Sequence, residues 1–444
     1  MKFEEYFDLK DITINTTNAC NLKCKYCFEH NKNNQCLDNG QMEIILDKCW
    51  NNYILHNDSK QPFIVNFFGG EPFMNWKVIE HALKYAKDKH YNMEFNATTN
   101  LTILTDHMID IIEEYNLGLL VSIDGVKEIH DRNRCNTYDL VKTNVQRLVD
   151  KHLEYLLEAR MTLMPKDTSL LLKSIQSIIE MGIVNIAPVP VTDTLWNDED
   201  LKSLKENLSK VWEWLINIYN TDDNKQNISI KFIEDYIEKV MTIQAVEYQT
   251  KSCTAGSKLT CSIGANGDIM PCHQRHTVKN NYELMLMGNI FDNNDIKDVP
   301  FNDCTRHSEE DCDKCLARNI CSGGCPSENW SVNGYGNIMN KNQCEVFKAM
   351  IEVAIDYQDK ILHCSNLRSH RLISIKENLQ LLEYFKTNVL EVDKHSKKYL
   401  NNLMKFYEML SDKQGLLLPL FEETFMARIS ELININKEIM KGLK

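Results

Sequence analysis

Three cysteines near the start of the chain are the residues best placed to do chemistry. Cys20, Cys24 and Cys27 stand in the segment CNLKCKYC, at C-x3-C-x2-C spacing, directly after an apolar, β-branched stretch. Three thiols this close together can hold three irons of a [4Fe–4S] cube. The fourth iron then has no protein ligand and can bind a substrate or a cofactor. Zinc sites usually draw their thiols from C-x2-C pairs, so this triplet fits zinc poorly.

The composition describes a folded, acidic protein. Its 444 residues, 43% of them hydrophobic, are enough for two or three domains with sizeable cores. The formal net charge of −13 argues against broad nucleic-acid binding, which needs a basic surface to replace phosphate counterions. A cationic or neutral partner stays compatible with this charge, although an acidic surface also serves solubility alone.

The 16 cysteines and the polar start of the chain indicate a cytoplasmic protein. The first ten residues, MKFEEYFDLK, lack the apolar core of a signal peptide. No apolar run approaches the ~20 residues needed to span a bilayer, so we expect no membrane partner. A disulfide framework would need an oxidising compartment. We therefore expect the clustered cysteines to hold metal ions or iron–sulfur clusters.

Short β-rich runs alternate with helical segments between residues 12 and 191. The predicted strands are Ile12–Thr16, Phe63–Phe68, Met93–Thr98, Gly118–Ile123, Glu158–Leu163 and Ile183–Val189. The predicted helices between them are Met42–His56, Asn75–His90, Thr105–Tyr115, Thr137–His152 and Ser169–Met181. This alternation predicts right-handed βαβ units and a parallel sheet. Six such units are two short of a closed barrel, so we predict an α/β fold with a partial (β/α)6 barrel of the TIM type, open at one side.

The distinctive residues fall at one place in each unit. The cysteine triplet follows the first strand, Gly69–Pro72 (GGEP) follows the second and Thr98–Asn100 closes the third. Ser122 and Asp124 close the fourth strand, and Arg160 lies in the fifth. Because the carboxyl ends of parallel strands form the catalytic face of such folds, we expect these residues to meet at one rim.

A second cysteine-rich region extends from Cys253 to Cys344. It has little periodicity and many turn residues, so metal sites are expected to hold its fold. Helical segments precede it at 200–219 and 228–245, and the last ~80 residues are helical again. We therefore expect a barrel at 1–222, a helical linker at 223–250, a cysteine-rich domain at 251–350 and a helical extension at 351–444.

The CNLKCKYC triplet followed by GGEP resembles the radical S-adenosylmethionine (SAM) superfamily. In that family the open iron is chelated by the amino and carboxylate groups of SAM. The resemblance implies a 5′-deoxyadenosyl radical that takes a hydrogen atom from the substrate, and an external electron donor of the flavodoxin or ferredoxin type. The cofactor then carries the hard step, and the protein must position it and exclude water.

The resemblance also suggests which residues surround SAM. Gly69 and Gly70 would permit close approach of its methionine end, and Glu71, before Pro72, or a neighbouring carbonyl would take the ammonium group. Tyr26 resembles the aromatic position beside the adenine.

Four further residues follow from the same resemblance. Ser122 and Asp124 match a segment beside the ribose, and Arg160 would meet the carboxylate bidentately. For these three, a rim hydrogen bond or a salt bridge is the alternative. Asn100 closes a Thr-Thr-Asn-Leu segment where relatives commonly read TTNG, which weakens a glycine-specific role at that place.

The downstream spacing resembles the SPASM domain, which usually holds two auxiliary [4Fe–4S] clusters. The family pattern would give one cluster the ligands Cys253, Cys261, Cys272 and Cys325. It would give the other cluster Cys312, Cys315, Cys321 and Cys344. Three clusters are then expected in all, with Cys304 as a reserve ligand. Zinc is the alternative at these sites, because C-x2-C is a common zinc knuckle.

SPASM relatives act on peptides or proteins, which leaves several reactions open. The first is an intrapeptide crosslink in a precursor peptide, a cysteine thioether of the sactipeptide or ranthipeptide type. The second is oxidation of Cys or Ser to formylglycine in a sulfatase, and the third is a carbon–carbon or ether crosslink. Sulfatase-maturating enzymes carry an aspartate base directly after the cysteine that corresponds to Cys272. This chain has His273 there. His273 is our candidate catalytic base, and the departure favours crosslinking.

A non-enzymatic reading is a multi-cluster electron carrier or a zinc-stabilised binding module. Motifs gathered along one rim of a barrel argue against it, because a carrier needs no such cavity.

Overall fold

The structure is a computed structural model. It describes residues 1–29, 32–57, 60–191, 193–221, 228–243, 253–276, 281–302, 312, 314–317, 321, 323–336 and 338–364, with 373, 375–376, 401–402 and 404–406. Cys304 and most of the predicted C-terminal extension lie outside the described residues. The chain divides into two compact units. One comprises Met1–Val211, Ile230–Phe232 and Gln249–Glu352, and the other comprises Trp212–Ser229, Ile233–Tyr248 and Val353–Lys444.

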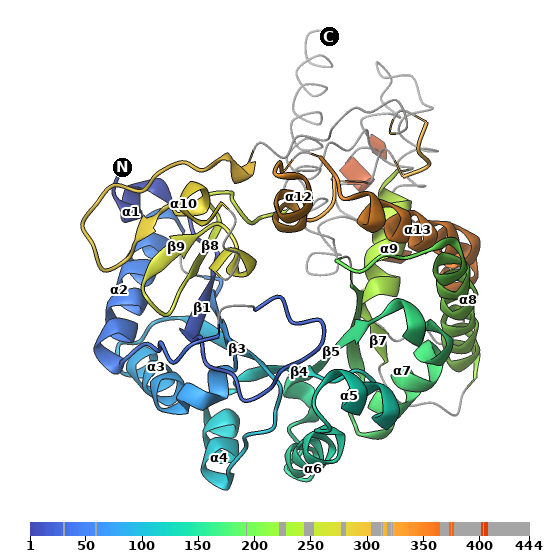
Figure 1. Ribbon diagram of the computed structural model, residues 1–444, viewed down its shortest axis with the longest axis horizontal. Coiled ribbons are helices and arrows are strands. Elements are labelled where there is room, and N and C mark those ends of the chain that lie inside the picture. The colour runs from blue at the N-terminus through green and yellow to red at the C-terminus, as the bar shows by residue number, and fades with distance from the viewer. Residues whose placement is uncertain are drawn as a thin grey trace, which may run out of the picture. The chain divides into compact units, whose positions relative to one another are not determined.

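A curved parallel sheet forms the centre of the first unit (Figure 1). Its strands are β1 (Asp11–Thr17), β2 (Phe63–Gly69), β3 (Met93–Thr99), β4 (Gly118–Ser122), β5 (Leu157–Leu163) and β6 (Asn185–Pro190). Each of these strands pairs in parallel with the next. The six predicted strands and the partial barrel are therefore confirmed.

Helices cover the outer face of this sheet (Figure 1). They are α2 (Asn39–His56), α3 (Trp76–Asp88), α4 (Asp106–Tyr115), α6 (Tyr138–Val149) and α7 (Leu171–Glu180), each within a few residues of its predicted bounds. Alternate strand residues such as Val65, Phe67 and Val121 point into this layer and are fully buried. The short helix α5 (Lys127–Asn133) is an addition that hydrophobic periodicity did not reveal.

The other face of the sheet is polar. The parallel register sets Thr13 beside Asn66, then Asn66 beside Asn96, and these side chains are partly exposed. Two layers nearer the carboxyl ends, Ser122 lies beside Arg160. Because successive side chains of a strand point to opposite faces, the apolar core lies under the helices and the inner face is left for polar groups.

The cysteine-rich region continues the same sheet. Strand β8 (Thr260–Ile263) pairs in parallel with β1, while β9 (Asp268–Met270) and β10 (Gly288–Asn289) follow in antiparallel order. Strand pairing therefore joins β8 of this region to the barrel, and both belong to one compact unit.

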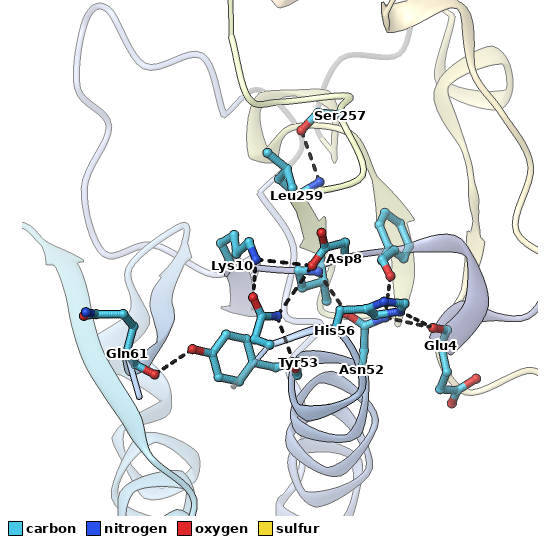
Figure 2. A network of polar contacts seen from close by, with 12 residues as sticks. Glu4, Asp8, Lys10, Asn52, Tyr53, His56, Gln61, Ser257 and Leu259 are labelled. Carbon is cyan, nitrogen blue, oxygen red and sulfur yellow. Dashed lines mark hydrogen bonds and ion pairs between the residues drawn. The ribbon is translucent and has the colours of Figure 1, made fainter. Parts of the chain in front are cut away.

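The segment before β1 fastens this junction (Figure 2). The buried side chain of Asn52, on α2, donates to the carbonyls of Glu4 (3.1 Å) and Phe7 (2.7 Å) and accepts from the amide of Leu9 (2.9 Å). The amide of Lys10 then donates to the carbonyl of Leu259 (2.8 Å). The segment that begins with Cys253 is thus held to the barrel through backbone bonds.

The remaining described elements are mostly helical. They are α1 (Phe3–Tyr6), α8 (Asp198–Asn220), β7 (Ser229–Ile230), α9 (Lys231–Ile243), α10 (Tyr282–Met285), α12 (Pro326–Asn333) and α13 (Lys341–Leu362), with short 3-10 turns between them. Within the second unit, Tyr357 donates to Glu213 (2.7 Å) and stacks on Trp212. Among the described residues, no helix combines the length and apolarity that crossing a membrane requires.

Candidate active site

Two glycines at the end of β2 press against the loop that carries the cysteine triplet. Gly69 has φ +127°, and a Cβ there would lie 2.1 Å from the carbonyl oxygen of Thr17. A Cβ on Gly70 would lie 2.3 Å from the carbonyl oxygen of Ala19. The amides of Gly70 and Glu71 donate to these same two carbonyls, at 2.9 Å each. Only glycine fits at both positions. The GGEP turn therefore fixes the position of the loop at Thr17–Ala19, directly before Cys20.

The Glu71 carboxylate joins the ends of β2 and β3. It is buried, accepts from the amide of Phe73 (3.1 Å) and the hydroxyl of Thr99 (2.6 Å), and accepts from the amide of Asn100 (2.7 Å). Burial raises its pKa to about 7, against the lowering effect of these bonds. With the carboxylate so engaged, a neighbouring backbone carbonyl is the better candidate acceptor for the SAM ammonium group.

Asn100 extends this connection to the cysteine loop. Its side chain donates to Asn21 (3.0 Å), which lies between the first two cysteines. The next residue, Leu101, is fully buried and has φ +51°, in the left-handed region that favours glycine. The departure from TTNG therefore changes the side chain while the backbone keeps a glycine-like turn.

Tyr26 and Asp124 contact each other directly. The Tyr26 hydroxyl donates to one carboxylate oxygen of Asp124, and the other accepts from the amide of Thr162 (3.1 Å). Arg134 completes the cluster, with its Nε 3.1 Å from Asp124 and its guanidinium 5.1 Å from the centre of the Tyr26 ring. The buried ion pair positions Tyr26, and burial strongly raises the pKa of this phenol.

Arg134 was missed in the sequence. The signal that could have revealed it is Asp124, a carboxylate at a strand end that needs a nearby cation when it is buried. It lies at the end of α5, which also binds the loop: the amide of Lys25 donates to the carbonyl of Asn133 (3.0 Å) and the amide of Lys23 to the sulfur of Cys135 (3.3 Å).

One ammonium group, that of Lys32, interacts with the three thiols of the triplet. Cys20, Cys24 and Cys27 are all partly buried. Burial lowers the pKa of Lys32, yet all three thiols raise it and outweigh that effect. Burial raises the pKa of Cys24 to about 11, with Arg134 pulling it down. Three thiols close to positive charge suit a cluster that carries negative charge, so these residues fit a [4Fe–4S] cube.

His273 lies against the inner face of the sheet. Its ring centre is 4.6 Å from that of Phe68, at the end of β2, and 5.9 Å from that of Phe28, which follows the triplet. Burial lowers the pKa of His273 to about 4, and the positive charge of Arg160 lowers it further. The imidazole is therefore neutral at pH 7.

A second histidine lies one turn on and escaped the sequence analysis. The Nε2 atom of His276 is 3.0 Å from the hydroxyl of Ser262, which donates to the carbonyl of Thr13 (3.2 Å). Burial lowers the pKa of His276 to about 4, with His273 adding to the effect. The turn His273–His276 thus presents two neutral imidazoles beside the inner face.

Three of the four thiols expected at the first auxiliary site interact electrostatically. Burial raises the pKa of Cys325 to about 12, and Cys272 is among the charges that raise it. Burial likewise raises the pKa of Cys272 to about 11, with a contribution from Cys253. Cys261 is elsewhere. It is fully buried on β8, beside Ile12, and faces the core, where burial raises its pKa and the charge of Asp11 adds to the effect.

Three thiols of the second expected set also interact electrostatically. Burial raises the pKa of Cys344 to about 11, and both Cys321 and Cys315 raise it further. The amide of Cys315 donates to the carbonyl of Cys312 (3.2 Å), so the fourth thiol is adjacent in the chain. In the described part of the chain, no three His, Cys, Asp or Glu side chains converge as they would on a single metal ion. In a [4Fe–4S] cluster each thiolate binds a different iron, so the thiols need not converge on one point.

The cysteine triplet lies at the carboxyl rim of a parallel partial barrel, where it fits an iron–sulfur cluster. Residues 14–178 match the sequence profile of the radical SAM superfamily. The chain contains a radical SAM domain and is a radical SAM enzyme.

Its relatives carry several specific activities. A cysteine-type anaerobic sulfatase-maturating enzyme of Clostridium novyi is 23% identical over 384 residues, 79% of this chain and 96% of that protein. The radical SAM cyclopropyl synthase TigE of Paramaledivibacter caminithermalis is 24% identical, over 80% of this chain and 75% of TigE. An uncharacterised protein of Methanocaldococcus jannaschii is 33% identical over 125 residues. The match covers 28% of this chain and 41% of that relative.

Solved structures share the fold beyond the barrel. Native anSMEcpe with bound AdoMet and the Cp18Cys peptide superposes with a TM-score of 0.63 at 18% identity, over 83% of this chain and 99% of that chain. Streptococcus suis SuiB bound to the precursor peptide SuiA gives a TM-score of 0.54 at 15% identity, over 77% of each chain.

Proposed function

We propose that the protein is a peptide maturase that joins a cysteine sulfur to a carbon of another residue within a ribosomally made precursor peptide. The position of His273 carries this proposal. It lies on the inner face with Phe28 and Phe68, beside the rim where the cysteine triplet is held. A base is needed there, because the substrate thiol must lose its proton when its sulfur forms the new bond.

The triplet would hold one cluster, and SAM would bind at its open iron. When bound, this pair supplies a 5′-deoxyadenosyl radical that removes one hydrogen atom from a peptide carbon. The chain's own contribution is placement. Gly69 and Gly70 fix the loop, Tyr26 is held by Asp124, and Arg160 beside Ser122 offers a guanidinium group to a carboxylate.

Formation of the proposed bond can be balanced in atoms, protons and electrons. Joining S to C removes one hydrogen atom, one proton and one electron from the peptide. His273, unprotonated at pH 7, is placed to take the proton. The electron needs an acceptor, and two auxiliary clusters would supply it, for a total of three clusters. The electron that starts the reaction would come from a flavodoxin or ferredoxin type donor.

We assign the auxiliary ligands from the observed placement of the thiols. The first site would take Cys253, Cys272 and Cys325. The second would take Cys312, Cys315, Cys321 and Cys344. Cys261 is left out, because a thiol on the helix side of β8 cannot reach a site on the other side without breaking its pairing with β1. The peptide-bound structures of anSMEcpe and SuiB support a peptide substrate.

Formylglycine formation in a sulfatase is the second candidate. It is favoured by the sulfatase-maturating relative that matches along 96% of its length. Against it stands the imidazole of His273 at the position where those enzymes have an aspartate.

One experiment separates the two reactions. The reconstituted enzyme, with dithionite and SAM, is incubated with cysteine-containing peptides encoded beside its gene and, separately, with a sulfatase-derived peptide. We expect a product that has lost two hydrogens, keeps its sulfur and resists alkylation by iodoacetamide. A product that has lost its sulfur would establish formylglycine formation instead. Release of 5′-deoxyadenosine without change in either peptide would contradict both.

A further inference from the structure

The side chain of Asn329 is bonded to three separate backbone segments. It is fully buried in α12. Its Nδ2 donates to the carbonyls of Gly323 (2.8 Å) and Gly336 (2.9 Å). Its Oδ1 accepts from the amide of Asn340 (2.9 Å). One amide therefore joins the chain before α12 to two points after it.

These three points flank two thiols of the proposed second auxiliary site. Gly323 follows Cys321 by two residues, and its amide contacts the Cys321 sulfur (3.4 Å). On the other side, the carbonyl of Asn340 accepts from the amide of Cys344 (3.0 Å). The Cys321 sulfur also lies 3.9 Å from the sulfur of Met339, the residue directly before Asn340. The hydrogen bonds of Asn329 therefore hold the two ends of the loop between these cysteines together.

This loop needs a fixed point because its turns are built from glycine. Gly323, Gly324 and Gly334 have φ of +90°, +81° and +72°. Glycine loses more conformational freedom on folding than any other residue, so such a loop does not hold its ends together by itself. A neighbouring bond, from the amide of Cys325 to Gln343 Oε1 (2.9 Å), ties the first auxiliary set to the same segment.

We propose that Asn329 is the positioning residue of the second auxiliary site. It holds the Cys321 loop against Asn340–Cys344, so that Cys344 reaches the same cluster as Cys315 and Cys321. It acts through these cysteines and does not contact the cluster. The inference rests on the proposed function, because it requires a [4Fe–4S] cluster at these thiols.

The test compares reconstituted full-length proteins: wild type, Asn329→Ala, Cys344→Ala, the double variant and Asn333→Ala. Asn333 is the matched control. It lies one turn further along α12, is partly exposed, and makes one bond, to the carbonyl of Ile338 (2.8 Å). Iron and sulfide content, Mössbauer spectra and EPR spectra after dithionite reduction are measured for each protein. Release of 5′-deoxyadenosine reports separately on the triplet cluster.

We expect Asn329→Ala to lose one cluster's iron and sulfide and to reproduce the spectrum of Cys344→Ala. The double variant should lose nothing more, Asn333→Ala should keep every cluster, and Asn329→Ala should still release 5′-deoxyadenosine. Full cluster content in Asn329→Ala would overturn the inference while leaving the proposed function intact. Loss of every cluster would also overturn it, since Asn329 would then support the whole fold. A wild-type protein with the triplet cluster alone would overturn both.

Discussion

The Tyr26 hydroxyl is hydrogen-bonded to Asp124, a residue 98 positions away. This bond fastens the cysteine loop, which follows β1, to the end of β4. The Arg134 guanidinium lies against both residues, 3.1 Å from Asp124 and 5.1 Å from the Tyr26 ring centre. Two residues that the sequence placed beside SAM thus also hold each other, and they set the geometry of the loop before any cofactor binds.

Arg134→Met should strongly destabilise the protein. It leaves the fully buried Asp124 carboxylate without its cation, and removing one partner of a buried ion pair costs about 3–5 kcal/mol. The thermal unfolding midpoint and the iron content of the triplet should both fall. Lys84→Met, which breaks an exposed pair with Glu80, is the control and should leave the midpoint unchanged. Equal midpoints for the two variants would contradict the role of the buried pair.

Gly70→Ala should prevent the cysteine loop from seating. The new Cβ would lie 2.3 Å from the Ala19 carbonyl oxygen, so the backbone must move. We expect little iron at the triplet and no release of 5′-deoxyadenosine. Gly40→Ala is the matched control: its Cβ meets nothing nearer than 3.5 Å, and alanine in a helix is favoured by about 0.5–1 kcal/mol. Normal cluster assembly in Gly70→Ala would show that the close approach is not required.

His130→Gln should remove part of the pH dependence of stability. His130 is fully buried, 3.4 Å from the Asp124 amide and 3.1 Å from the Thr137 hydroxyl. Burial lowers its pKa to about 4, Arg134 and Lys127 lower it too, and Asp124 and Asp131 raise it.

The unfolded chain then binds a proton on His130 more readily than the folded protein. Its contribution is fully present above pH ~6.5 and is lost as the pH falls toward ~4, by about 3 kcal/mol at most. Thermal midpoints of wild type and His130→Gln should therefore converge on acidification. Parallel midpoint curves for the two proteins across this range would rule the effect out.

His273→Ala should separate radical formation from product formation. The imidazole is assigned to the substrate proton, so 5′-deoxyadenosine should still be released while crosslinked peptide falls by about 10²–10⁴-fold. His276→Ala, which alters the neighbouring imidazole, is the companion variant and should have a smaller effect. Both products are quantified by mass spectrometry. Undiminished crosslinking in His273→Ala would remove this residue from the mechanism.

Cys261→Ala should retain all clusters, whereas Cys272→Ala should lose one. Cys261 faces the apolar core beside Ile12, while Cys272 lies with Cys253 and Cys325. The iron content per chain, measured for both variants, tests these two expectations. A cluster lost in Cys261→Ala would restore the four-cysteine assignment that the spacing alone suggested.

The prediction of the barrel succeeded because its strands are encoded locally. Runs such as Phe63–Gly69 and Met93–Thr99 carry β-branched and aromatic residues, and helical periodicity separates them. The cysteine-rich region lacked this signal. Strands β8 and β9 are short and gain their stability from pairing with β1, a contact between distant segments that no local pattern contains.

The sequence by itself determined the chemistry: the spacing of Cys20, Cys24 and Cys27, the GGEP turn, and their places at successive strand ends. Tertiary structure decided which residues act together. It buried Cys261 on the core side of β8, brought Arg134 to Asp124, and set His273 against Phe68. The reason is physical. Ligand spacing and strand period are properties of neighbouring residues, whereas the face on which a side chain emerges depends on strand register, and register is fixed only when the sheet forms.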